Sequence, residues 1–275
     1  MVLGAHEGVA GGYATAFQRA EADGAECVQI FVRSPRAWAA RALGGDEVAS
    51  FRAEARRTGM PTAAHSTYLA NLAAADAALR RRSQGALADE LARCEALGIP
   101  FLIFHPGSSQ DEARGIAAVA AGMVRALEAV PGRTMLLVEI TAGQGSALGW
   151  RFEQIAAIRE AVPGRLRRRV GVCFDTCHAF AAGHDLCTPD AYAATFQALD
   201  RTVGLEHVKA FHLNDCKKPL GCRVDRHEHI GRGQMGLEPF RLLVNDRRWK
   251  DTPGFLETEL RFAENLAVLR SLVHA

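Results

Sequence analysis

The chain has 275 residues, of which 48% are hydrophobic and 23% charged, a composition typical of a globular protein with a sizeable core. It starts without the basic segment and apolar run of a signal peptide, and no stretch approaches the ~18 apolar residues of a membrane helix. We therefore expect a cytoplasmic protein with no membrane contact. The net charge of +2 does not by itself indicate nucleic acid, so a DNA partner has to be argued from local charge.

Short β-rich apolar runs alternate along the chain with stretches of helical spacing. The predicted strands are residues 2–5, 27–31, 61–64, 101–104, 135–138, 170–174, 208–211 and 254–256. Helices are predicted between most of them, for example over 76–97 and 116–130, with Gly98 and Gly132 at their ends. A doubly wound open sheet would alternate similarly, but eight strand-then-helix units favour a single-domain (β/α)8 TIM barrel, an α/β fold, over residues 1–275.

A histidine or carboxylate follows six of the predicted strands. His65 and His105 follow the third and fourth strands. Glu139, Asp175 and His212 end the fifth, sixth and seventh strands, and Glu257 ends the eighth. His178 comes three residues after Asp175, and Asp225 and His227 lie in the loop after the seventh strand. In a barrel these strand ends converge on one face, where active sites lie. Imidazole and carboxylate are the ligands of Zn²⁺, Mn²⁺ or Fe²⁺. The pattern predicts a cluster of metal ions there.

Each of these residues alone is more often structural, because a histidine at a strand end is usually a hydrogen-bonded core residue. Nine of them in register with six strands and one loop are not explained by nine separate structural roles. The other histidines, His6, His184, His207 and His274, are expected to lie outside the cluster. His6 could approach the site from the first strand, but no partner for it is visible in the sequence around it. His229 is the most plausible substitute ligand, because it is the next i+2 position after His227.

The sequence resembles the endonuclease IV family of apurinic/apyrimidinic endonucleases, nearly from end to end. The resemblance is carried by residues 4–6 (GAH), 10–12 (AGG), 104–108 (FHPGS), 141–145 (TAGQG), 175–185 (DTCHAFAAGHD), 212–217 (HLNDCK), 223–227 (RVDRH) and 256–258 (LET). It implies a TIM barrel with three zinc ions and a ligand position for each of the nine residues above. His65 and His105 would hold one ion, with Glu139 bridging to a second ion held by Asp175, His212 and Glu257. His178, Asp225 and His227 would hold the third.

This resemblance implies the hydrolysis of DNA 5′ to an abasic site, which leaves a 3′-hydroxyl and a 5′-deoxyribose phosphate. Removal of blocking groups from 3′ ends is expected as a second activity. Glu139, Asp175, His212 and Glu257 are the expected catalytic residues, with hydroxide as the nucleophile. Three divalent ions are expected per chain, Zn²⁺ first, with Mn²⁺ or Fe²⁺ as alternatives. The expected partner is double-stranded DNA, bound by a monomer.

The resemblance also points to residues that touch DNA. Arg36, Tyr68 and Leu69 would enter the duplex at the lesion, where a missing base lowers the cost of opening the stack. Lys217, Arg223 and Arg226, in the loop after the seventh strand, are placed to bind phosphates, together with Lys218 and Arg232. Trp38 is expected to pack as a core residue at the start of a helix.

Two departures from the family pattern stand near these motifs. Ile140 replaces a common asparagine, which would remove a polar contact beside Glu139. Gly8 stands where serine is common. Neither is a candidate ligand.

Other polar and thiol side chains are expected to be structural. The sequence has seven cysteines, and Cys173, Cys177, Cys216 and Cys222 lie near the motifs without Cys-x-x-Cys spacing, which predicts reduced, packed thiols. Two arginine runs are expected on solvated surface away from the site: Arg165 and Arg167–Arg169, which precede the sixth strand, and Arg80–Arg82 on a helix.

Two other functions are compatible with parts of this pattern. A sugar isomerase or epimerase of the xylose-isomerase-like barrels would explain Glu139, Asp175, His212 and Glu257, but it leaves the other five candidate ligands without a role. A DNA-damage binder on an inactive nuclease scaffold would be expected to have lost ligands, and none is missing here.

Overall fold

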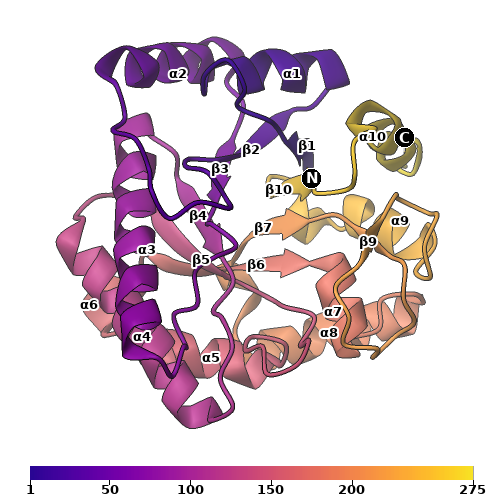
Figure 1. Ribbon diagram of the computed structural model, residues 1–275. Helices are drawn as coiled ribbons and strands as arrows, with labels where there is room; N and C mark the ends of the chain where they lie inside the picture. Colours follow the sequence, from indigo (N-terminus) through magenta and orange to yellow (C-terminus); the bar gives the residue numbers. More distant parts are fainter. Residues whose placement is uncertain (275) are drawn as a thin grey trace.

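The computed structural model, which describes residues 1–274, contains a closed barrel of eight parallel strands (Figure 1). The barrel strands are β1 (Val2–His6), β2 (Cys27–Phe31), β3 (Thr62–His65), β4 (Phe101–Phe104), β5 (Met135–Glu139), β6 (Val170–Asp175), β7 (Val208–His212) and β10 (Pro253–Leu256). The barrel closes where β1 pairs with β10. This confirms the predicted single-domain TIM barrel and excludes the open sheet.

Helices surround the barrel on the outside (Figure 1). They are α1 (Thr15–Asp23), α2 (Gly45–Thr58), α3 (Ala77–Leu97), α4 (Glu112–Ala129), α5 (Phe152–Glu160), α6 (Gly164–Arg167), α7 (Thr176–Ala182), α8 (Pro189–Thr202), α9 (Glu238–Asn245) and α10 (Phe262–Ser271), with 3₁₀ turns at Leu205–His207 and Arg247–Trp249. Several begin at side-chain caps, as Asp76 does when it accepts a bond from the amide of Leu79. Gly98 ends α3 in the left-handed conformation as predicted, whereas α4 ends at Ala129, before Gly132.

The loop after β7 carries a small antiparallel pair, β8 (Asp215–Cys216) and β9 (His227–Glu228). This pair is separate from the barrel. It folds the loop back on itself, so that residues 225–227 return to the barrel mouth.

The barrel interior is filled by one layer of apolar side chains, here called the interior layer. Its members are Cys27, Ala63, Ile103, Leu137, Cys173, Ala210 and Phe255, all without exposed surface. Gly4 of β1 lies beside this layer, and a Cβ at Gly4 would stand 1.8 Å from the carbonyl oxygen of Cys27. A second, larger apolar cluster packs between the strands and the helices. The interior is therefore a packed core, as in other barrels of this class.

Some sequence predictions were wrong in detail. Some strand bounds differ by one residue: β3 runs from Thr62 to His65 rather than over 61–64, so that His65 is a strand residue. Trp38 lies in a loop, half-buried, under the guanidinium of Arg82, and starts no helix. Arg169 is buried and donates to the carbonyls of Thr134 and Val130, because its long side chain reaches under the barrel strands.

No helix in the part of the chain that the structure describes is long and apolar enough to cross a membrane.

The close approach at Gly4 gives a stability prediction. Gly4→Val would force β1 away from β2, and we expect a loss of about 2–3 kcal/mol in the free energy of unfolding, measured by urea denaturation. Gly45→Ala is the matched control, because nothing lies within 4 Å of a Cβ there and α2 begins at that residue. Equal stability of the two variants would contradict the packing argument.

Candidate metal centre

A second layer of side chains lies directly above the interior layer, and it is polar. Side chains two residues apart on a strand point to the same side, so each interior residue is followed by one further inward-facing residue. This polar layer takes one residue from each barrel strand or its end: His6, Gln29, His65, His105, Glu139, Asp175, His212 and Glu257. The barrel thus brings together all six candidate ligands that the sequence assigned to strand ends.

Glu139 lies at the centre of this layer with no exposed surface. Its Oε2 is 2.9 Å from Nε2 of His65 and 3.1 Å from Nε2 of His105. Its Oε1 is 3.0 Å from Nδ1 of His212. Nδ1 of His178 lies 3.1 Å from the same Oε1. The two oxygens of one carboxylate therefore face different side chains, Oε2 facing His65 and His105 and Oε1 facing His212 and His178. With Glu139, His65 and His105 form the first set of side chains, and His212 belongs to the second.

The second set also contains Asp175 and Glu257. Nδ1 of His212 lies 3.4 Å from Oε2 of Glu257 and 3.8 Å from Oδ2 of Asp175. One potential ligand atom from each of Glu139, Asp175, His212 and Glu257 lies within 4.8 Å of the others. A single ion could contact all four.

The third set is built partly from the loop after β7. Nε2 of His178, in the first turn of α7, is 3.2 Å from Oδ2 of Asp225 and 3.4 Å from Nε2 of His227. Two imidazole nitrogens that face each other beside a carboxylate are typical of a metal site. The Cys177 thiol stands nearby, within 4.8 Å of ligand atoms of Asp175 and His227, and it is buried.

Four of these histidines have one ring nitrogen bonded to an acceptor outside the sets. Nδ1 of His65 faces the carbonyl of Ser66 at 2.8 Å, and Nδ1 of His178 faces that of Ile140 at 3.0 Å. Nδ1 of His227 faces the carbonyl of Glu257, and Nε2 of His212 faces Oε1 of Gln29. Each acceptor requires a proton on that nitrogen and leaves the other nitrogen with a free lone pair toward the carboxylates. This is how metal-binding histidines are oriented in proteins, so the residues present fit divalent ions.

The charges in the centre support the same interpretation. Burial alone would raise the pKa of Glu139, but the imidazoles of His105 and His212 outweigh it and hold the pKa well below its usual range. Burial would likewise lower the pKa of His178, but the carboxylates of Asp175 and Asp225 outweigh it and raise the pKa. The cluster thus keeps its carboxylates ionised only with positive charge between them, which divalent cations can supply.

Two residues of the polar layer were missed from the sequence. His6 was set aside for lack of a partner, and this was wrong: its Nδ1 lies 3.2 Å from Oε1 of Glu257. Gln29 donates to the same Glu257 oxygen at 2.6 Å and also contacts both His6 and His212. The period of two from Gly4 and Cys27 was the signal that could have found them.

The remaining histidines lie outside the three sets. His184 stacks on Phe152 and bonds the carbonyl of Trp150, and His207 pairs with Glu206. His229 contacts Asn265 through Nδ1, and His274 contacts Arg241.

The two departures from the family pattern have local explanations. Ile140 is fully buried, and its backbone carbonyl accepts from His178, so that contact needs no polar side chain. Gly8 is exposed, and a Cβ there would meet only Arg19 at 3.7 Å.

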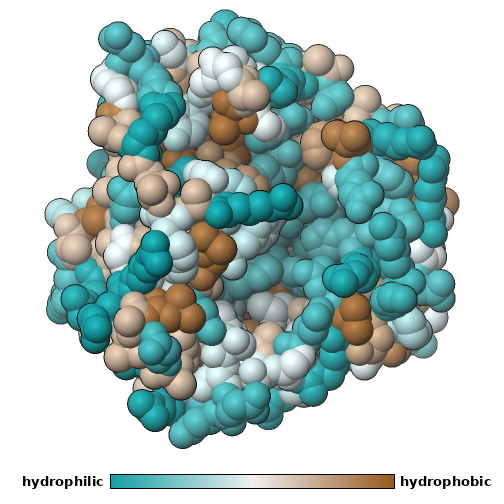
Figure 2. Space-filling model, in the orientation of Figure 1, coloured by the Kyte–Doolittle hydropathy of each residue, from teal (hydrophilic) through white to brown (hydrophobic). Residues whose placement is uncertain are grey.

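A hollow of about 370 Å³ opens over the first and third sets. Its walls include Tyr68, Leu69, Asn71 and Gln144, and its floor includes His65, His105, His178 and Asp225. The Tyr68 side chain is 61% exposed. The amide of Tyr68 donates to the carbonyl of Pro35, which joins its loop to the one that carries the exposed Arg36. Figure 2 shows a hollow with mainly hydrophilic walls near the middle of the molecular face.

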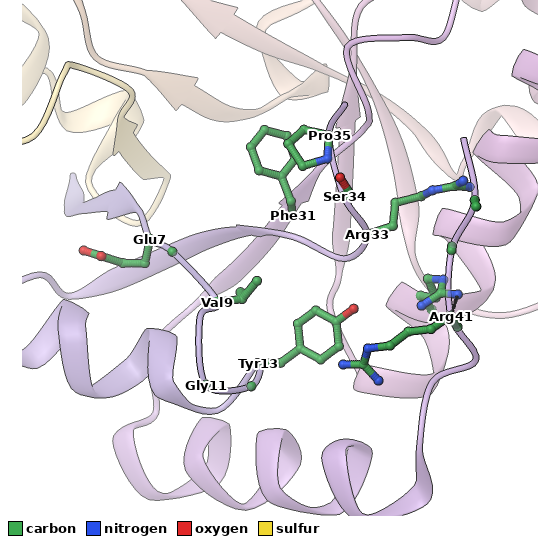
Figure 3. A pocket seen from close by; sticks show the side chains of 14 residues that line it. Glu7, Val9, Gly11, Tyr13, Phe31, Arg33, Ser34, Pro35 and Arg41 are labelled. Atoms are coloured by element: carbon green, nitrogen blue, oxygen red, sulfur yellow. Dashed lines mark hydrogen bonds between the residues drawn. The ribbon is translucent and has the colours of Figure 1, made fainter. Parts of the chain in front are cut away.

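A second hollow, of about 480 Å³, lies between the loops after β1 and β2 (Figure 3). Tyr13, Phe31, Arg33 and Arg41 line it, and the Glu7 side chain points away from Tyr13 and Arg33. None of the nine candidate ligands lines this hollow. The ring of Phe31, which also packs against His6 and His65, separates it from the polar layer.

Lys217 and Arg226, two of the predicted phosphate contacts, are exposed in the loop after β7. Lys218 and Arg232 are exposed in the same loop. Arg223 is exposed as well, but its guanidinium is bound within the protein: Nε donates to the carbonyl of Gly143 at 2.8 Å. The structure thus brings a set of cations to the rim of the ligand-bearing mouth.

Comparison with known proteins identifies the family. Residues 17–272 match the family model of the xylose isomerase-like TIM barrel. The chain is 51% identical to a probable endonuclease 4 of Chloroflexus aggregans, over 98% of this chain and 97% of that protein. It superimposes on the crystal structure of endonuclease IV from Thermus thermophilus with a TM-score of 0.90 and 40% identity, over 99% of this chain and 98% of that one. The chain belongs to the endonuclease IV family.

The sugar epimerases, the alternative considered from the sequence, resemble this chain in fold only. A D-tagatose 3-epimerase-like protein superimposes with a TM-score of 0.73 at 14% identity, over 99% of this chain and 97% of that one. Membership of the endonuclease IV family, together with the three sets of candidate ligands, indicates divalent metal binding.

Gln29 gives a prediction for the second set. Gln29→Leu keeps the side chain's approximate volume but removes the acceptor for Nε2 of His212 and the donor to Glu257. We expect metal affinity at this set to fall about 10- to 100-fold, measured by competition with a chromophoric chelator. Circular dichroism should show an intact fold. Unchanged metal affinity would mean that Gln29 does not orient the ligands.

Proposed function

We propose that the chain is a metal-dependent endonuclease that hydrolyses the phosphodiester bond 5′ to an abasic site in double-stranded DNA. Water adds to the phosphorus and the bond to the upstream O3′ breaks, so the products are a 3′-hydroxyl and a 5′-deoxyribose phosphate. The same attack on a phosphate at a blocked 3′ end would release the blocking group. Family membership supports the reaction class, and the geometry of the polar layer supports the site.

The observation that carries the proposal is the position of Glu139. Its two oxygens face two different sets of donors at 2.9–3.1 Å, and the carboxylate is fully buried. A mononuclear site would need only one of these faces. The arrangement supports a bridging role between two adjacent ions, with His65 and His105 on one side and Asp175, His212 and Glu257 on the other.

We propose three divalent ions per chain, the third held by His178, Asp225 and His227. Imidazole and carboxylate donors suit Zn²⁺, and they also accept Mn²⁺ or Fe²⁺. When bound, such ions supply Lewis acidity to phosphate oxygens and lower the pKa of water, so that hydroxide is available at neutral pH.

The chain's own residues give the site its shape and charge. We assign catalysis to Glu139, Asp175, His212 and Glu257, which are largely buried beneath the hollow, so that solvent screens their charges only weakly. His178 and Asp225 lie at the floor of the hollow, into which a substrate phosphate would enter. Backbone acceptors fix the ring orientations before substrate arrives, so little reorganisation is needed during the reaction.

The DNA-binding surface surrounds this hollow. Tyr68 and Leu69 overhang the candidate ligands, and Arg36 lies on the adjoining loop. We propose that these three side chains enter the duplex at the lesion, and that Lys217, Arg223 and Arg226 lie near backbone phosphates. A missing base lowers the cost of opening the helix, which gives selectivity for damaged DNA.

A duplex with a single tetrahydrofuran abasic analogue tests the reaction. The analogue cannot undergo β-elimination, so a 3′-hydroxyl product requires hydrolysis. We expect incision by protein loaded with Zn²⁺ or Mn²⁺, loss of incision after chelation, and recovery on adding metal back. No incision by the metal-loaded protein would contradict the proposed function.

Glu139→Gln tests the bridging role. The amide keeps the size of the side chain but cannot bridge two cations with two anionic oxygens, so kcat/KM should fall about 10³-fold or more. Glu206→Gln, on the surface away from the polar layer, is the matched control and should retain activity. Normal turnover by Glu139→Gln with a full complement of metal would exclude bridging.

Tyr68 and Leu69 give a prediction about binding. Removing both side chains (Tyr68→Ala with Leu69→Ala) should raise the Kd for abasic duplex about tenfold or more, since contacts that hold the opened step are lost. The Kd for undamaged duplex, set by phosphate contacts, should change little. Fluorescence anisotropy in Ca²⁺ or with the Glu139→Gln variant measures both values, and an equal weakening for the two duplexes would argue against lesion recognition.

A further inference from the structure

The third set of candidate ligands differs from the other two in how it is held. Asp225 and His227 lie on the long loop after β7 rather than on a barrel strand, and the Asp225 side chain is 43% exposed. The short pairing of β8 with β9 fixes His227 from one side. Asp225 lies before this pairing and needs another support.

Arg223, two residues before Asp225, makes such a support. Its Nε donates to the carbonyl of Gly143 at 2.8 Å, and one Nη donates to the carbonyl of Gly145 at 3.4 Å. The centre of its guanidinium lies 4.3 Å from the centroid of the Trp150 ring, a cation–π stack. One side chain thus joins the loop after β7 to the loop after β5.

The backbone around Arg223 is held in an unusual conformation. Arg223 has φ of 56°, in the left-handed region that non-glycine residues rarely adopt. Its own amide donates to the carbonyl of Ala181 at the end of α7. Such strain persists only where surrounding contacts hold it, so the conformation of this segment depends on those contacts.

The loop after β5 is shaped to receive this side chain. Gly143 has φ of 75°, and a Cβ there would lie 2.7 Å from the Trp150 ring and 3.1 Å from Nε of Arg223. The carbonyl of Trp150 in turn accepts from His184, whose ring stacks on Phe152. The neighbouring Gln144 accepts from the amide of Asp225 at 3.4 Å. Trp150 is therefore a fixed platform, and Asp225 is tied to the same loop.

We propose that Arg223 is a positioning residue for the third metal site: its stack on Trp150 and its bonds to Gly143 and Gly145 hold Asp225 and His227 in place to bind the ion. The inference rests on the proposed three-ion centre and assigns Arg223 a role within the protein in addition to its place on the DNA-facing rim. A lysine would carry the same charge toward DNA, but it lacks the planar fork that stacks and donates to two carbonyls at once.

Metal content provides a test that does not depend on DNA cleavage. Wild type, Arg223→Ala and Arg223→Lys would be loaded with Zn²⁺, desalted and analysed by inductively coupled plasma mass spectrometry, and ion release to a chromophoric chelator would be followed. We expect both variants to lose about one ion per chain, or to release one ion about tenfold or more faster than wild type. The two remaining ions should be unaffected.

Arg151→Ala is the matched control. The Arg151 guanidinium lies 5.4 Å from the same Trp150 ring, but it pairs with Glu112, and among the described residues no hydrogen bond or ion pair joins it to the Asp225 loop. This variant should keep the wild-type ion content. If Arg223→Ala does not fold, Arg223→Lys provides the test, because lysine keeps the aliphatic part of the side chain and its positive charge.

The possible outcomes separate this inference from the proposed function. Wild-type ion content and release in both Arg223 variants would overturn the positioning role. Full recovery of ion content and release rate in Arg223→Lys would also overturn it, because a lysine keeps only the charge. Weaker DNA binding with unchanged ion content would do the same, because it would assign Arg223 to phosphate contact alone. A wild-type protein that holds fewer than three ions, or does not incise abasic DNA, would instead overturn the proposed centre.

Discussion

Glu139 is a carboxylate with no access to water, placed among histidines and three further carboxylates. Removing one such charge from water costs several kcal/mol even after the protein relaxes, so it is retained only with close compensation. Here imidazole nitrogens lie 2.9–3.1 Å from both of its oxygens, and divalent cations held between these groups can supply the compensating charge. Those imidazoles in turn keep their rings in place through bonds to backbone carbonyls and Gln29. The other parts of the centre are arranged around this one buried charge.

The barrel places Glu139 and its partners together because side chains alternate along each strand. Leu137 lies in the interior layer, and Glu139, two residues on, lies in the polar layer above it. The same step relates Ala210 to His212 and Cys173 to Asp175. The packed apolar layer closes the barrel below, and the polar layer is thereby set at a fixed depth. A shift of one residue in any strand would move its ligand to the outer face.

Much of the fold and of the centre could be predicted because the signals are local. Eight apolar runs predicted the barrel strands, and the residue after six of those runs was a candidate ligand. Gln29 was missed because an amide is not a typical metal ligand and acts here by hydrogen bonds to His212 and Glu257. His6 was set aside because its partner, Glu257, lies at the other end of the sequence. Their roles depend on contacts between β1, β2 and β10, which are far apart in sequence. Arg169 was misplaced for a similar reason, since its acceptors lie about 35 residues away on other elements.

The position of the third set could be predicted from the sequence, but the contacts that support it could not. The family resemblance predicted that Asp225 and His227 face one site with His178, and they do lie together against it. What holds them there, the stack of Arg223 on Trp150, joins residues more than 70 positions apart and has no sequence pattern of its own. The two kinds of set are therefore supported differently. Two sets are built from strand ends, whereas the third takes Asp225 and His227 from a loop, and all but the second set border the hollow. The geometry of the third set thus depends on contacts between loops rather than on the register of the barrel strands.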